Sequence, residues 1–168
     1  MNFTLEQWNK SYISSAAKHA NNLKIAVNLR DGFPHPYTSE DAEWYVNDCI
    51  EKNDCNQITR AIVVDGEAVG SVGIFIKDDV YRKSGELGYW LGEEYWGKGI
   101  MSAAVRQICK EAFAQFDIIR IFAEPYSHNT GSRRVLEKTG FTLEGVMKNS
   151  VCKHEKIYDS CMYALLKG

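Results

Sequence analysis

Apolar residues recur along the chain with two periods, one typical of amphipathic helices and one typical of strands. The segment from Gly99 to Phe116 has apolar residues at helical spacing, at Ile100, Ala104, Val105, Ile108, Cys109, Ala112, Phe113 and Phe116. Glu86–Leu91 before it has the composition of a strand, and the glycine-punctuated segment Gly92–Lys98 joins the two. This stretch therefore predicts a strand, a turn and a helix in direct succession.

The N-terminal part predicts helices after one short strand. A turn-rich loop with Asp-Gly and two prolines interrupts these helices. After the loop, Thr38 and Asp41 form a capping-box pattern that predicts the start of the third helix. In order, the expected elements are a strand at Phe3–Trp8, a helix from Ser11 to Ala20, a short helix at Leu23–Leu29, the loop Arg30–Tyr37 and a helix from Thr38 to about Asn53.

The remaining segments predict further strands and one more helix. Ile58–Val64 and Val69–Ile76 flank Asp65-Gly66, which is a strong hairpin signal. The other elements are a central strand at Ile118–Ala123, a helix at Asn129–Thr139 closed by Gly140, and strands at Phe141–Met147 and Ile157–Leu166. This order predicts an α/β (α+β) fold with a mixed sheet.

Composition narrows the class of protein. The 168 residues are 45% hydrophobic and 25% charged, which predicts a single globular domain over residues 1–168. A formal net charge of −2 and the lack of a basic run argue against nucleic acid as a primary partner. Neither a signal-peptide pattern nor a membrane-spanning apolar run is expected, and the five cysteines without a CxxC pair predict reduced thiols in the cytoplasm. The four scattered histidines predict no metal site.

The glycine turn before Ile100 is the first candidate for chemistry. A turn that opens a helix leaves backbone N–H groups unpaired, and the helix dipole adds partial positive charge, so phosphate or pyrophosphate is a suitable ligand. A tight turn without a ligand is the alternative. Gly97-Lys98 is followed by Gly99 rather than Ser or Thr, and Ser102 replaces the last glycine of a dinucleotide fingerprint, so neither nucleotide motif fits.

The run Trp96-Gly97-Lys98-Gly99-Ile100-Met101, directly after the strand, resembles the acetyl-CoA-binding motif of the GNAT N-acetyltransferases, in particular the RimJ/RimL branch of ribosomal-protein N-terminal acetyltransferases. Trp96 and Met101 depart from the Arg/Gln-x-x-Gly-x-Gly/Ala pattern, whereas Gly99 is kept. The resemblance implies the GNAT fold, a mixed and mostly antiparallel sheet flanked by helices, and acetyl-CoA as co-substrate without a metal. It implies cofactor binding by Trp90, Leu91, Trp96, Gly97, Lys98, Gly99, Ile100, Met101, Asn129, Ser132 and Lys138.

A second motif, Asn129-Thr130-Gly131-Ser132 followed by Glu137-Lys138-Thr139-Gly140-Phe141, resembles the N-x-x-S…EKxGF segment of this family. The resemblance implies that Asn129 holds the pantetheine amides and that Ser132 hydrogen-bonds or protonates the leaving thiolate. A helix N-cap at Asn129 with Ser132 as a first-turn residue is the structural alternative. For Lys138, a solvated helix face is the alternative to a phosphate contact.

The acceptor side is less defined by the sequence. Glu86 is the candidate general base and a candidate substrate-binding residue, and Tyr37, within the RimJ/RimL-like phrase Pro34–Ala42, is the other acceptor-side candidate. RimL-like proteins place a glutamate near the C-terminus as their base, and Val151 stands there in this chain. The sequence thus predicts an N-acetyltransferase that acts by direct attack of a primary amine on acetyl-CoA. A protein N-terminus is the implied acceptor, whereas a small-molecule amine, a non-catalytic acyl-CoA-binding module, and a monomer or homodimer all stay open.

Overall fold

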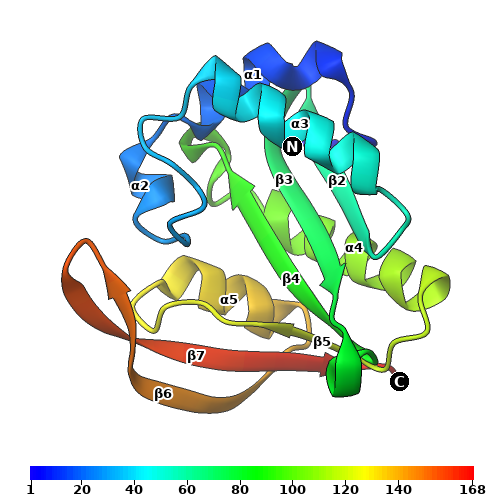
Figure 1. The fold of residues 1–168 in the computed structure, drawn as a ribbon, viewed down its shortest axis with the longest axis vertical. Coiled ribbons are helices and arrows are strands. Elements are labelled where there is room, and N and C mark those ends of the chain that lie inside the picture. Colours follow the sequence, from blue (N-terminus) through cyan, green and yellow to red (C-terminus); the bar gives the residue numbers. More distant parts are fainter.

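A computed structural model describes residues 1–168 and confirms the predicted mixed sheet flanked by helices (Figure 1). The seven-stranded sheet has the order β1-β2-β3-β4-β5-β7-β6. Its strands are β1 (Thr4–Glu6), β2 (Gln57–Val64), β3 (Glu67–Ile76), β4 (Ser84–Leu91), β5 (Arg120–Ala123), β6 (Thr142–Lys153) and β7 (Lys156–Leu166). The α-helices are α1 (Ile13–Ala20), α2 (Leu23–Ala26), α3 (Ser39–Lys52), α4 (Ile100–Gln115) and α5 (Thr130–Lys138).

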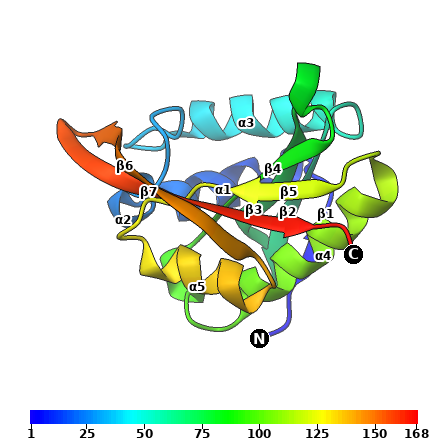
Figure 2. The same ribbon diagram turned by 90° about the horizontal axis from the view of Figure 1, so that it is seen from below.

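Helices cover both faces of the sheet, as the view in Figure 2 shows. One core lies between the sheet and α4 and includes Ile108, Val72 and Ile121, while the other lies between the sheet and α1 and α3 and includes Val46 and Ala61. Strands buried on both faces need near-continuous apolar sequence. This explains why β2 and β3 are mainly apolar and do not alternate strictly between apolar and polar residues.

A capping box and two glycines with positive φ mark where several of these elements begin or end. The Thr38 side chain accepts from the Asp41 backbone N–H while the Asp41 carboxylate accepts from the Thr38 N–H, so the predicted capping box begins α3. Gly66, with a φ of +82°, makes the β2–β3 turn after Asp65. Gly140, with a φ of +93°, follows α5 as predicted.

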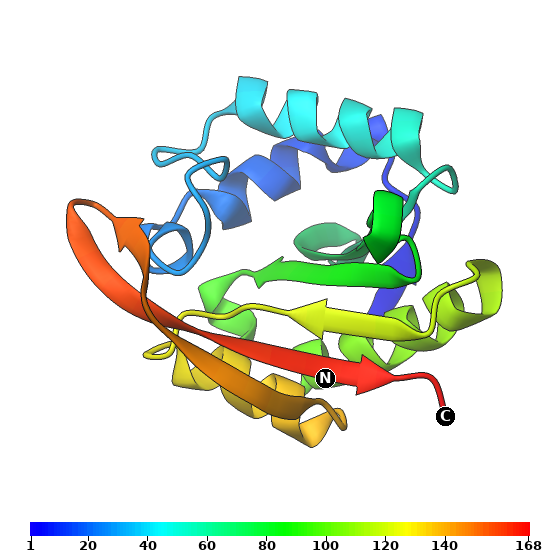
Figure 3. The same ribbon diagram turned by 60° about the horizontal axis from the view of Figure 1, so that its bottom comes forward.

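The hairpin of β6 and β7 differs most from the expectation. The predicted strand ends at Met147, whereas β6 continues to Lys153 through a register shift between Met147 and Val151. Lys148–Ser150 are polar and exposed, so no apolar alternation marked them as strand. Figure 3 shows the hairpin curving beyond the sheet toward the loop after α2, where it contributes to the site.

Candidate functional site

The site begins where two parallel strands separate. β4 pairs with β5 only from Ser84 to Glu86, although β4 continues to Leu91. From Leu87 to Leu91, β4 pairs only with β3, so its other edge has no neighbouring strand. Two cavities open at this divergence, and both are lined by Tyr89, Asn129 and Ser132.

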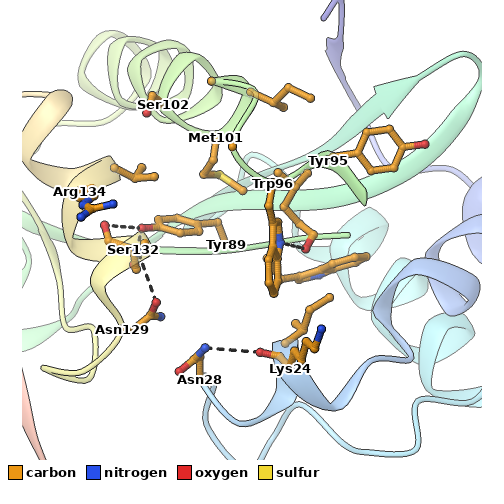
Figure 4. A pocket seen from close by; sticks show the side chains of 18 of the residues that line it. Lys24, Asn28, Tyr89, Tyr95, Trp96, Met101, Ser102, Asn129, Ser132 and Arg134 are labelled. Carbon is orange, nitrogen blue, oxygen red and sulfur yellow. Dashed lines mark hydrogen bonds between the residues drawn. The ribbon is translucent and has the colours of Figure 1, made fainter. Parts of the chain in front are cut away.

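The first cavity, of about 500 Å³, lies beside the turn between β4 and α4 (Figure 4). Gly97 and Gly99 have φ values of +70° and +77°, a region that side chains with a Cβ rarely adopt. A Cβ on either glycine would meet nothing within 4 Å, so packing does not explain them. These glycines instead shape the backbone that faces the cavity.

Backbone N–H groups of this turn are available to a ligand. From Gly97 to Ser102 none of them has an acceptor within the protein, and Ala103 donates the first bond of α4, to the Gly99 carbonyl. Successive free N–H groups at the start of a 16-residue helix favour an anion, because the helix dipole adds positive potential there. The turn therefore has the donors that a pyrophosphate group requires.

All but one of the predicted cofactor-binding residues line this cavity. They are Trp90, Leu91, Trp96, Gly97, Gly99, Ile100, Met101, Asn129, Ser132 and Lys138. The Lys98 side chain does not, because its Nζ donates to the Glu94 carbonyl at 2.7 Å and lies over the Tyr95 ring. Trp96 is fixed by a 2.8 Å bond from Nε1 to the Leu91 carbonyl. Arg134 also lines the cavity, with an exposed side chain that forms no ion pair.

Ser132 and Tyr89 form a hydroxyl pair where the two cavities meet. Their oxygens are 2.6 Å apart, and Figure 4 shows Tyr89 of β4 directed at the first turn of α5. Burial raises the pKa of Tyr89 to about 12, so its phenol is protonated at neutral pH. The Asn129 Oδ1 accepts from the Ser132 N–H at 3.3 Å, which makes Asn129 the N-cap of α5, while its side chain also lines both cavities.

The second cavity, of about 760 Å³, lies on the opposite side of the junction. Its walls come from the loop after α2, from α3, from the middle of β4, from the segment after β5 and from the β6–β7 hairpin. Carboxylates outnumber cations among its lining residues, with Asp31, Asp41, Asp48, Glu86 and Glu124 against Arg30 and Lys153. Such a lining favours a positively charged ligand.

Glu86 and Tyr37, the predicted acceptor-side residues, both line this second cavity. The Glu86 carboxylate lies 2.6 Å from the Arg30 guanidinium and 3.5 Å from the Lys77 ammonium. Glu86 in turn raises the pKa of Arg30. Tyr37 is buried and its ring lies 4.9 Å from that of Phe33, so it forms part of an aromatic wall.

The hairpin and the loop after α2 close the cavity together. Lys153 is 5% exposed, and its Nζ lies 3.0 Å from Asp31. The Tyr126 hydroxyl donates to the Leu29 carbonyl at 2.9 Å and holds the same loop. Val151, which stands where RimL-like proteins place a glutamate, lines this cavity, so no carboxylate is supplied from that position.

Sequence reasoning missed Tyr89, Arg30 and Glu124 as site residues. Tyr89 pairs with Ser132 across 43 residues of sequence, so no local pattern indicates this hydrogen bond. Glu124 could have been noticed, because it follows a short apolar strand whose inward residues are Ile121 and Ala123. Alternation then places Glu124 on the opposite face.

The structure also bears on membrane insertion and metal binding. None of the helices combines the length and the apolar composition that a membrane crossing requires. His, Cys, Asp and Glu side chains do not gather anywhere in groups of three or more that could hold a metal ion. The five cysteines are free, and Cys49, Cys109 and Cys161 are buried as predicted.

Comparison with known proteins shows which protein family the chain matches. The model of the acetyltransferase (GNAT) domain family matches residues 3–142. A putative ribosomal N-acetyltransferase, YdaF of Bacillus subtilis, is 34% identical over 114 residues, which are 68% of this chain and 62% of the relative. The match thus spans less than two thirds of the relative's length.

Solved structures share the fold over almost the whole chain. RimL, the ribosomal L7/L12 alpha-N-protein acetyltransferase in complex with coenzyme A, has a TM-score of 0.86 at 22% identity, covering 99% of this chain and 94% of RimL. The Salmonella typhimurium acetyltransferase that modifies the N-terminal serine of ribosomal protein L7/L12 has a TM-score of 0.84 at 22% identity, covering 100% and 96%. At this identity the likeness concerns the fold.

Proposed function

Because this chain belongs to the GNAT family of N-acetyltransferases, we propose that it transfers the acetyl group of acetyl-CoA to a primary amine by direct attack on the thioester. The observation that carries the proposal is the run of free N–H groups from Gly97 to Ser102, which borders a cavity that meets a second, acidic cavity at Ser132. A ligand bound by its phosphates at the first end can reach the second with its acyl group.

In this proposal the first cavity holds acetyl-CoA. The turn binds the pyrophosphate through backbone N–H groups, and Arg134 and Lys138 supply charge at the rim. The free edge of β4 beyond Glu86 offers backbone groups to the pantetheine amides, with Asn129 beside them. Because the main donors are backbone groups, the departures at Trp96 and Met101 are compatible with this mode of binding.

Ser132 and Tyr89 act on the leaving group. The protonated phenol of Tyr89 donates to the Ser132 oxygen, which leaves the Ser132 proton free to hydrogen-bond the thiolate as the carbon–sulfur bond breaks. A phenol with a pKa of about 12 does not give up its proton to a thiolate, whose acid has a pKa of about 8.5. The pair therefore stabilises the leaving charge by hydrogen bonding.

The second cavity holds the acceptor, and we propose a protein N-terminal amine. Its acidic lining suits an ammonium group, and Glu86, Tyr37 and the aromatic wall are placed to contact the first residues of a peptide. RimL is named as a ribosomal L7/L12 alpha-N-protein acetyltransferase and YdaF as a putative ribosomal N-acetyltransferase, which supports the same class of acceptor. The predicted cytoplasmic location and the monomeric or homodimeric state stay predictions.

An acetylation assay tests this function. The protein is incubated with acetyl-CoA and hexapeptides that begin with Ser, Ala or Met, and CoA release and peptide mass are followed. The matched controls are the same peptides with a blocked N-terminus and an internal lysine, and a polyamine, an amino sugar and free amino acids complete the panel. We expect acetylation of the free N-termini.

Other outcomes would contradict the proposal in different ways. Transfer only to a small amine would correct the acceptor class. An acetyl-CoA-dependent rise in Tm without transfer to any amine would indicate a binding module, because a ligand at 100 times its Kd adds about 2.7 kcal/mol of stability whether or not it reacts. No rise with acetyl-CoA or CoA would overturn the cofactor site itself.

A further inference from the structure

Glu124 is the carboxylate of the acceptor cavity that has no partner within the protein. The other acidic lining residues are all engaged, Asp31 by Lys153, Asp41 in the capping box of α3, Asp48 by Lys52 and Glu86 by Arg30. Glu124 is half-buried and forms neither an ion pair nor a hydrogen bond. A partly buried carboxylate without a partner in a ligand cavity is available to the ligand.

The position of Glu124 directs its side chain to the acceptor side of the sheet. On β5, Ile121 and Ala123 belong to the core on the α4 side, so Phe122 and Glu124 belong to the other face. Phe122 pairs in register with Glu86, which lines the acceptor cavity. Glu124 comes directly after Ala123, the last residue of β5, where β4 and β5 have already separated.

The electrostatics of its neighbours agree with this placement. The pKa of Arg30 is raised mainly by Glu86, and the charge of Glu124 adds to the effect. Burial raises the pKa of Tyr126, and the charge of Glu124 adds to it as well. The charge of Glu124 therefore acts on Arg30 of the loop after α2 and on Tyr126 of its own segment.

We propose that Glu124 is a catalytic residue that removes the first proton from the acceptor ammonium, and this role rests on the proposed acetyl transfer. An α-amine has a pKa of about 8, so roughly nine tenths of it is protonated at pH 7 and cannot attack. A general base that removes this proton in place raises the rate by about 10²-fold or more. Glu124 is the free carboxylate in the cavity.

The step balances in protons and bonds. The ammonium gives one proton to the Glu124 carboxylate, and the neutral amine then forms the carbon–nitrogen bond with the thioester carbonyl. As the carbon–sulfur bond breaks, the second nitrogen proton is lost and the CoA thiolate leaves as the thiol. Glu124 returns its proton to water, so the products are the amide and CoA with no other reactant.

Glu86 is less suited to this role, although the sequence favours it. Its carboxylate is held between Arg30 and Lys77, and taking a proton would leave both cations without their partner. This arrangement suits a group that positions the loop after α2 and the bound acceptor. The proton transfer is therefore assigned to Glu124, while Glu86 stays on the acceptor-binding wall.

The test compares Glu124→Gln with the wild type on a free N-terminal serine hexapeptide at pH 7 and pH 9. We expect kcat/KM to fall roughly 100-fold at pH 7. At pH 9 the amine is largely neutral in solution, so the defect should narrow by about tenfold. Glu51→Gln is the matched control, because Glu51 is an exposed glutamate on α3 that lines neither cavity.

The acetyl-CoA-dependent rise in Tm shows whether each variant is folded and keeps its cofactor site. Glu124→Asp, which retains a carboxylate, should be more active at pH 7 than Glu124→Gln. Wild-type kcat/KM in Glu124→Gln, an equal defect at both pH values, or an Asp variant no better than the Gln variant would each overturn the inference. If the wild type acetylates no peptide, the proposed function fails instead.

Discussion

The two cavities that meet at Ser132 are built from different parts of the chain and in different ways. The first has a run of free backbone N–H groups from one continuous stretch, Gly97 to Ser102, next to the start of α5. The second is lined by charged and aromatic side chains from six separate segments between Asn28 and Lys153. In the proposed function, cofactor recognition thus depends on local backbone shape, whereas acceptor recognition depends on tertiary assembly.

This difference decides which substitutions each half tolerates. We expect a site made of backbone groups to withstand changes of side chain and to fail when a residue cannot adopt the required φ. We expect a site made of side chains to fail with the loss of a single charge such as Glu124.

Gly99→Glu should remove acetyl-CoA binding. A side chain at a φ of +77° costs about 1–2 kcal/mol in strain, and a carboxylate would face the position proposed for the pyrophosphate. We expect the acetyl-CoA-dependent rise in Tm to disappear and the KM for acetyl-CoA to increase at least about 100-fold, since several free N–H donors to a charged group are affected. The measurement is thermal unfolding with and without the ligand.

Gly66→Glu is the matched control for this variant. Gly66 has a φ of +82° in the β2–β3 turn, and a Cβ there also meets nothing within 4 Å, so the conformational strain is similar. Its position lines neither cavity. The control should lose stability yet keep the rise in Tm, and an equal loss of the rise in both variants would show that strain alone explains the effect at Gly99.

The same contrast explains how much could be predicted from sequence. The strand, turn and helix around Gly99 were predicted because hydrophobic period, glycine positions and helix start agree within one stretch. The outer part of β6 was missed because Lys148–Ser150 have no apolar alternation, and their strand pairing depends on β7. Arg30 and the Lys153–Asp31 pair reach the cavity only through tertiary folding, so no local pattern identifies them.

Ser132→Ala should lower kcat about 10²-fold while leaving the affinity for acetyl-CoA nearly unchanged, because a donor to the leaving thiolate acts chiefly in the transition state. Steady-state kinetics together with the ligand-dependent rise in Tm separate the two effects. Ser127→Ala is a suitable control, since Ser127 lies in the loop just before α5 but lines neither cavity. A higher KM with unchanged kcat would make Ser132 a binding residue.

Tyr89→Phe should have a smaller effect, roughly tenfold on kcat, because it removes the group that orients Ser132 rather than the donor itself. In the double variant with Ser132→Ala the two losses should not add, since residues in one hydrogen-bonded pair are coupled. Additive losses in this double-mutant cycle would contradict the pairing.

The high-pH stability of Tyr89→Phe provides a measurement independent of activity. The folded pKa of Tyr89 is about 12 and the unfolded value is about 10, so the folded protein keeps a proton that the unfolded chain loses between these values. This contribution to stability is complete below pH 10 and is lost as pH rises through 12. Tm should therefore fall less steeply with pH in Tyr89→Phe than in the wild type, and parallel Tm profiles above pH 10 would contradict the buried phenol that the Ser132 pair requires.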